Sequence, residues 1–137
     1  MKKIDRIIKD YNKYSFIWLH DKTNQYADND RFSCFFRYGI ILIPYNDTDW
    51  TPSMYFALLH EIGHCETYKN RQSSATREFL ATQWAINNSK KYNIMVSQKE
   101  KNEWQEYIYS FLKIKNKSKY KLNWNPMKEC EQCYWEF

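Results

Sequence analysis

Glycine and proline are scarce in this sequence of 137 residues, with 2 and 3 occurrences. Tight turns depend on these two residue types, so their scarcity argues against a turn-rich β-sandwich or barrel. Long hydrophobic runs are also missing, because none approaches the roughly 20 apolar residues that span a bilayer. The first residues, MKKIDRIIKDYNKY, are too polar for a signal peptide. We therefore expect a soluble, cytoplasmic protein with no membrane partner.

Aromatic and hydrophobic side chains are plentiful, at 19% and 43% of the chain, which is enough for a packed core. The length predicts a single domain over residues 1–137. A basic segment and a tail with one C-x-x-C pair occupy residues 113–137. The four cysteines do not have the spacing of a secreted disulfide framework. We expect the tail pair, Cys130 and Cys133, to stay reduced or to form a labile disulfide.

The hydrophobic pattern predicts an α+β fold with a small three-stranded sheet beside a helical half. Thr51 before Pro52 is typical of a helix start, and Ser97 with Glu100 forms a capping box. Two apolar runs on either side of Gly39 are expected to be a hairpin or two neighbouring strands, with their register open. The expected helices are residues 3–13, 52–68, 74–88 and 97–113, and the expected strands are 14–19, 32–38 and 40–44.

The segment ALLHEIGHCE, residues 57–66, places His60 and His64 four positions apart in a predicted helix. Side chains at this spacing are neighbours on one face, so both imidazoles can bind one metal ion. Glu61 is turned about 100° from His60 and about 60° from His64, beside the pair rather than among the ligands. Two histidine ligands with a glutamate general base are typical of zinc peptidases. The alternative is two core histidines, but burying both with a carboxylate and no metal is costly.

A catalytic zinc site needs a third protein ligand and an open position. Glu78 is the best-placed candidate, since it follows His64 by 14 residues in the next predicted helix. A short loop can fold that helix back against the first, and the small side chains of Ala81 and Ala85 allow close approach. Glu66 is turned about 200° from His64 and points away. The alternatives for the third ligand are His20, Asp47 and Asp49. The remaining nearby carboxylates are expected on a solvent face: Glu100, Glu103 and Glu106.

The segments FALLHEIGH and EFLATQWA together resemble the ImmA/IrrE family of zinc metallopeptidases. That family has an aromatic residue four positions before H-E-x-G-H, and then E-x-x-A-x-x-aromatic-A on the next helix. The resemblance covers about residues 32–88, with GIILIP in the place of the strand that precedes the zinc helix. The matching residues are Phe56, His60, Glu61, Gly63, His64, Glu78, Ala81, Trp84 and Ala85.

This resemblance implies a zinc-dependent peptidase of a bacterium or its mobile elements that cleaves a DNA-binding repressor. The chain departs from the family where it continues INNSKKY instead of reaching a proline soon after the second pattern. It also has no helix-turn-helix domain, so the repressor would be a separate protein. SprT-like proteins are a second comparison, because they join H-E-x-x-H to a zinc ribbon. A ribbon needs two C-x-x-C pairs, whereas this chain has one, and Cys34 and Cys65 stand alone.

We therefore expect one Zn²⁺ bound by His60, His64 and Glu78, in a cleft between the sheet and the helices. Glu61 is the expected general base, and a protein or peptide is the expected substrate. Several tyrosines could stabilise the oxyanion, and the sequence selects none of them. The alternative is a non-catalytic zinc-containing protein that docks to a protein or nucleic-acid partner. A lysine run without acids would supply that surface, although such runs are usually solvated: Lys113, Lys115, Lys117, Lys119 and Lys121.

Overall fold

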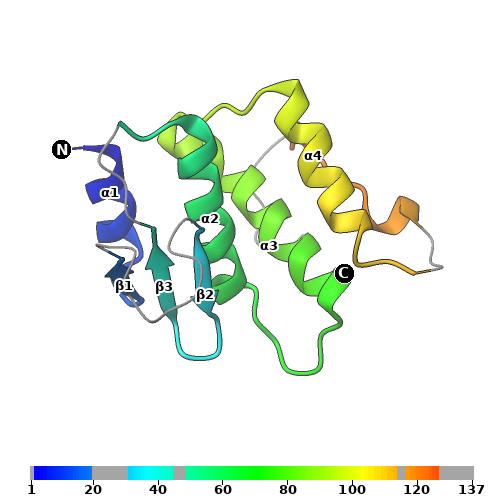
Figure 1. The fold of residues 1–137 in the computed structure, drawn as a ribbon, viewed down its shortest axis with the longest axis horizontal. Helices are drawn as coiled ribbons and strands as arrows, with labels where there is room; N and C mark the ends of the chain where they lie inside the picture. The colour runs from blue at the N-terminus through cyan, green and yellow to red at the C-terminus, as the bar shows by residue number, and fades with distance from the viewer. Residues whose placement is uncertain (1, 20–30, 45–48, 114–116, 127–137) are drawn as a thin grey trace.

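A computed structural model of the chain describes residues 2–19, 31–44, 49–113 and 117–126 (Figure 1). Its helices and strands confirm the expected α+β fold with a three-stranded sheet. In chain order they are α1 (Lys3–Asp10), β1 (Ser15–Trp18), β2 (Ser33–Phe35), β3 (Ile40–Ile43), α2 (Pro52–Glu66), α3 (Ser74–Ser89) and α4 (Gln98–Tyr109), with short 3-10 helices η1 (Lys90–Tyr92) and η2 (Lys117–Tyr120).

The sheet is mixed, with strand order β1-β3-β2. β1 runs parallel to β3, and β2 pairs antiparallel with β3 as one arm of a hairpin. Residues 32–38 were expected to form one strand, but only Ser33–Phe35 pairs with β3. The chain turns after Phe35, where the Tyr38 amide donates a 2.9 Å hydrogen bond to the Phe35 carbonyl oxygen. Gly39 completes the turn with a φ of 65°, a conformation that favours glycine.

The three long helices begin at capping residues. Thr51, Ser73 and Ser97 each accept a hydrogen bond from a backbone amide of the first turn, as proposed for the first and third of them from the sequence. α4 ends at Tyr109 rather than at residue 113, because tighter three-residue hydrogen bonds replace the helical pattern, from Phe111 to Ile108 and from Leu112 to Tyr109. α1 similarly ends at Asp10 instead of residue 13.

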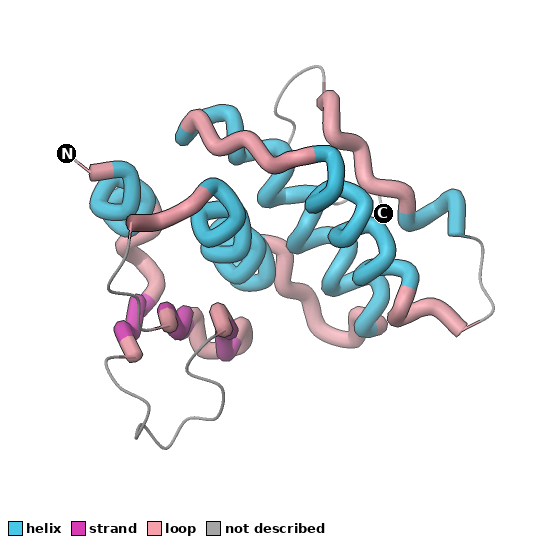
Figure 2. The backbone as a smooth tube through the Cα atoms, turned by 45° about the horizontal axis from the view of Figure 1, so that its top comes forward, coloured by secondary structure: helices cyan, strands magenta, loops and turns pink. Residues whose placement is uncertain are grey.

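Helices α2 and α3 lie side by side at the centre of the molecule (Figures 1 and 2). Gly63 is in contact with α3, since a Cβ atom at this position would lie 2.5 Å from the backbone oxygen of Ala81. This is closer than two non-bonded heavy atoms approach, so glycine is what permits the spacing of the two helices. The close approach of the two helices, which was expected from the small side chains of Ala81 and Ala85, is thus observed at Gly63 and Ala81.

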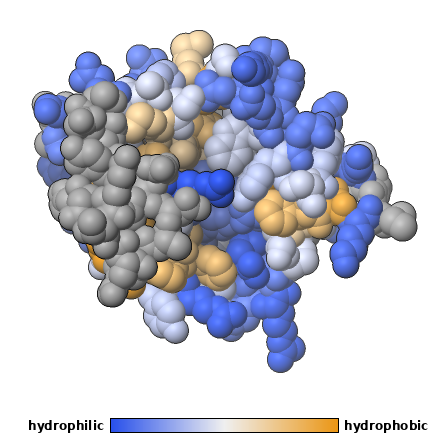
Figure 3. Space-filling view, in the orientation of Figure 1, coloured by the Kyte–Doolittle hydropathy of each residue, from blue (hydrophilic) through white to orange (hydrophobic). Residues whose placement is uncertain are grey.

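The sheet packs against one side of α2, while α3 and then α4 lie on the other side (Figure 2). Ile41 and Ile43 of β3 are fully buried, as are Phe56, Leu59 and Ile62 of α2, so α2 is the shared core element of both layers. On the face shown in Figure 3 the coloured surface is mostly hydrophilic, with hydrophobic side chains in small patches. No helix among the described residues is both long and apolar enough to cross a membrane.

Candidate metal centre

Three side chains from α2 and α3 converge on one point. The Nε2 atoms of His60 and His64 lie 3.1 Å apart. The Glu78 carboxylate reaches both imidazoles, with Oε1 3.4 Å from His60 Nε2 and Oε2 2.9 Å from His64 Nε2. Both histidines are buried and Glu78 is 13% exposed. The structure thus brings together the three residues that the sequence predicts as ligands.

These separations fit a small tetrahedral ion. Zinc is bound at about 2.0–2.1 Å by nitrogen and at similar lengths by oxygen, so two ligand atoms of a tetrahedral site lie about 3.3 Å apart. The three measured separations between the ligand atoms of His60, His64 and Glu78 span 2.9 to 3.4 Å. Two imidazoles and one carboxylate are also a donor set that zinc prefers when a position is kept open.

Thr82 fixes the protonation pattern of His60. Its hydroxyl donates to the Glu78 carbonyl oxygen at 2.8 Å and lies 3.0 Å from His60 Nδ1. A hydroxyl has one hydrogen to donate, so Thr82 must accept from Nδ1–H of the imidazole. In the neutral ring the Nε2 atom of His60 then carries the free lone pair, and it faces the point shared by His64 and Glu78.

Glu78 is ionised in this environment. Burial by itself would raise the pKa of its carboxyl group, but the adjacent imidazoles of His60 and His64 outweigh burial and hold the pKa below its usual range. A carboxylate that is deprotonated at neutral pH is the form that binds a metal ion.

His64 is supported differently from His60, since its ring stacks on Phe36 with centroids 6.0 Å apart.

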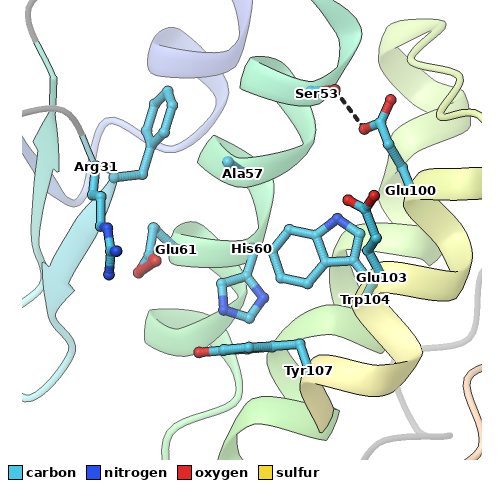
Figure 4. A pocket seen from close by; sticks show the side chains of 10 residues that line it. Arg31, Ser53, Ala57, His60, Glu61, Glu100, Glu103, Trp104 and Tyr107 are labelled. Carbon is cyan, nitrogen blue, oxygen red and sulfur yellow. Dashed lines mark hydrogen bonds between the residues drawn. The ribbon is translucent and has the colours of Figure 1, made fainter.

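A cavity of about 570 Å³ opens beside the three converging side chains. Glu61 lines it together with His60, and Figure 4 shows the Glu61 carboxylate beside the imidazole on the side of Arg31. Glu61 is absent from the group of converging ligand atoms. Its carboxylate therefore faces the space next to the proposed metal position, as the helical spacing predicts.

Helix α4 forms the opposite wall of this cavity, with Trp104 and Tyr107 (Figure 4). The Trp104 ring packs on His60 with centroids 4.9 Å apart. The Tyr107 phenol donates a 2.7 Å hydrogen bond to Glu78 Oε1. Burial, with the Glu78 carboxylate close by, raises the pKa of this phenol, so it remains protonated at neutral pH. The cavity therefore lies between α2 and α4. Arg31 and Phe32, which precede β2 in the sequence, also line it.

Two of the acidic residues of α4 also border the cavity. Glu100 and Glu103 line the cavity, and Glu100 also accepts a hydrogen bond from Ser53 of α2. The expected solvent face is therefore confirmed for Glu103, which is exposed, whereas Glu100 is partly buried beside Ser53. Glu106 is exposed and does not line the cavity.

Two cysteines that are far apart in the sequence come together beside Glu61. The thiols of Cys34 on β2 and Cys65 on α2 are both free. A hydrogen bond with Cys65, burial and the nearby Glu61 carboxylate hold the pKa of the Cys34 thiol well above its usual range. Cys34 is therefore a neutral thiol, which is not the form in which cysteine binds metals.

The other ligand candidates do not join the cluster or cannot be placed. Glu66 points away from the site, because its carboxylate binds Lys13 and Tyr14 at 3.0 and 3.1 Å. Asp49 is exposed and is not part of the converging group. His20, Asp47, Cys130 and Cys133 lie outside the described residues.

The lysine run is on the surface where the structure describes it. Lys113, Lys117, Lys119 and Lys121 are exposed, and Lys115 lies outside the described residues. Two of these ammonium groups lie over aromatic rings of the same chain, Lys117 over Tyr109 at 5.2 Å and Lys119 over Tyr120 at 5.9 Å. These contacts fit the interpretation of a solvated segment.

No family model, curated protein or solved structure matches the chain. The resemblance to the ImmA/IrrE metallopeptidases therefore depends on the residues of α2 and α3.

Proposed function

We propose that this chain is a zinc-dependent metallopeptidase that hydrolyses peptide bonds. The observation that supports it most is the convergence of His60, His64 and Glu78 beside a cavity that the Glu61 carboxylate also lines. When bound there, zinc would supply Lewis-acid polarisation of a carbonyl group and a lowered pKa for water. A structural zinc site is usually closed by four protein ligands, whereas only three converge among the described residues.

The residues of the chain have separate roles in this reaction. His60 and His64 offer neutral nitrogen donors, and Glu78 adds one negative charge that favours retention of a cation. Thr82 holds the His60 ring in the tautomer that leaves Nε2 available. Glu61 lies outside the ligand set, so it is free to take a proton from water as the oxygen bonds to the carbonyl carbon. The same carboxyl group then returns the proton to the leaving amine.

The substrate that we propose is a protein or peptide in an extended conformation. β2 is an edge strand of the sheet and lies next to α2, with Cys34 of β2 in contact with Cys65 of α2. An extended peptide could pair with this edge and pass the cavity. The likeness of α2 and α3 to ImmA/IrrE proteins suggests a DNA-binding repressor as this substrate. The two free thiols fit our further proposal of a reducing, cytoplasmic location.

The experiment for this proposal is incubation of purified, zinc-loaded protein with repressors encoded near it in the genome. Cleavage should appear as discrete fragments in mass spectra, should stop when a chelator removes the metal, and should return when zinc is added back. Protein that binds one zinc per chain but leaves every repressor and a mixed-sequence peptide library intact would contradict the proposal. It would favour the alternative, a non-catalytic zinc-containing docking protein.

A further inference from the structure

Tyr107 brings a polar hydrogen to the candidate metal centre from an element outside the two ligand helices. Its phenol lies 2.7 Å from Glu78 Oε1, which in turn is 3.4 Å from His60 Nε2. The phenol is therefore one hydrogen bond away from the converging ligand atoms. Tyr107 is 41% exposed and lines the cavity, so a bound peptide can reach the hydroxyl.

The orientation of the ring is held by its neighbours. Trp104 and Phe111 both meet the Tyr107 ring edge to face, with centroids 5.7 and 5.1 Å away and interplanar angles of 90°. Such contacts favour one ring orientation without binding the hydroxyl. Figure 4 shows the hydroxyl pointing past His60 into the space that the Glu61 carboxylate also faces. The Tyr107 hydroxyl of α4, a hydrogen-bond donor, and the Glu61 carboxylate of α2, the proposed base, thus border the same space.

We propose that Tyr107 is a catalytic residue that stabilises the oxyanion formed during peptide hydrolysis, an inference that rests on the proposed function. As the water oxygen bonds to the carbonyl carbon, the water proton passes to Glu61 and the carbonyl π electrons move onto the carbonyl oxygen. The Tyr107 hydroxyl turns from Glu78 to this oxygen and donates a hydrogen bond without losing its proton. When the C=O bond re-forms, the C–N bond breaks and Glu61 protonates the amine.

A purely positioning role for Tyr107 makes a different prediction. If the phenol served only to orient Glu78, its removal would weaken metal binding first and lower activity as a consequence. A donor to the oxyanion instead affects the transition state, where charge develops, and leaves the metal and the bound substrate as they were. Metal affinity and the separation of kcat from KM therefore distinguish the two roles.

The test compares zinc-loaded Tyr107→Phe with wild type and with Tyr109→Phe. Tyr109 is on the same helix but does not line the cavity, so its variant controls for loss of a phenol from α4. The probes are a fluorogenic peptide selected from a mixed-sequence library and its phosphonate analogue, whose tetrahedral anion mimics the oxyanion. Zinc content, kcat, KM and the calorimetric affinity for the phosphonate are measured for each protein.

We expect Tyr107→Phe to lower kcat by about 10²-fold, as for loss of one oxyanion donor. Its phosphonate affinity should fall in parallel, while KM, zinc content and the Tyr109→Phe control stay unchanged. Unchanged kcat, or a loss of kcat that follows a loss of zinc, would overturn this role alone. A wild-type protein that retains zinc but cleaves no peptide would overturn the proposed function together with it.

Discussion

The Thr82 hydroxyl joins the two ligand helices by bonding to His60 Nδ1 of α2 and to the Glu78 carbonyl of α3. The Thr82 side chain therefore sets the tautomer of His60, and it is held in place by the backbone of Glu78. The hydroxyl is fully buried, so water does not replace it. Its position implies that metal binding depends on a residue that does not itself contact the metal.

Thr82→Val should weaken zinc binding by about 10- to 100-fold, the usual effect of losing an outer-shell partner of a metal-binding histidine. Valine has nearly the same shape but cannot accept the Nδ1–H bond of His60. Competition with a chromogenic chelator measures the affinity. Thr82→Ser keeps the hydroxyl and should bind zinc like wild type. Equal affinities for the valine and serine variants would show that the hydroxyl has no part in metal binding.

Removal of any one ligand should abolish the stabilisation that zinc gives. Zinc at 100 times its dissociation constant should stabilise the wild-type fold by about 2.7 kcal/mol. His60→Ala, His64→Ala and Glu78→Ala should each lose most of this increment in urea unfolding with and without zinc. Glu66→Ala is the matched control, because that carboxylate binds Lys13 and Tyr14 instead. Full zinc affinity in Glu78→Ala would move the third ligand to another residue.

Gly63→Ala should destabilise the fold, although alanine normally favours a helix over glycine by about 1 kcal/mol. The added Cβ would meet the Ala81 backbone oxygen at 2.5 Å, and a backbone atom cannot simply rotate away. Overpacking of this kind typically costs about 1–3 kcal/mol. Urea unfolding measures the change, with Lys99→Ala on the exposed side of α4 as a control. A Gly63→Ala variant more stable than wild type would show that α2 and α3 can separate at little cost.

The metal-free protein should lose stability as the pH falls below about 4 to 5. The pKa of Glu78 is held below its usual value in the folded state, and the unfolded chain has a glutamate pKa near 4.3. The unfolded state therefore binds more protons in acid, so this part of the stability is present above that pH and is lost below it. Urea midpoints of chelator-treated protein between pH 6 and 3 measure the loss. Glu78→Gln should show a shallower decline, and an identical decline would assign the effect to other carboxylates.

Much of the site could be predicted because it depends on local spacing. His60 and His64 share a helix face because they are four positions apart. The loop between the two helices is only a few residues long, so α3 folds back against α2 and Glu78 faces the histidines. Thr82 could have been found by the same reasoning, since it follows Glu78 by one helical turn. These relationships are set by helix geometry and need no knowledge of long-range packing.

The rest of the site depends on how distant elements pack. Trp104 and Tyr107 have the pattern of an ordinary amphipathic helix, and only the packing of α4 against α3 brings them to the cavity. The pairing of Cys34 with Cys65 likewise depends on where β2 lies against α2. The parallel pairing of β1 with β3 joins residues 15–18 to 40–43, and hydrophobic alternation does not specify such a partner.

The most direct test of the peptidase proposal is the comparison of zinc-loaded Glu61→Gln with wild type against a cleaved repressor or library peptide. The amide is close in shape to the carboxylate but cannot accept the proton from water, and Glu61 is not among the converging ligands. We predict unchanged zinc content and substrate binding, with cleavage slowed by about 10²–10⁴-fold. Cleavage at the wild-type rate by Glu61→Gln, with zinc still bound, would contradict the account.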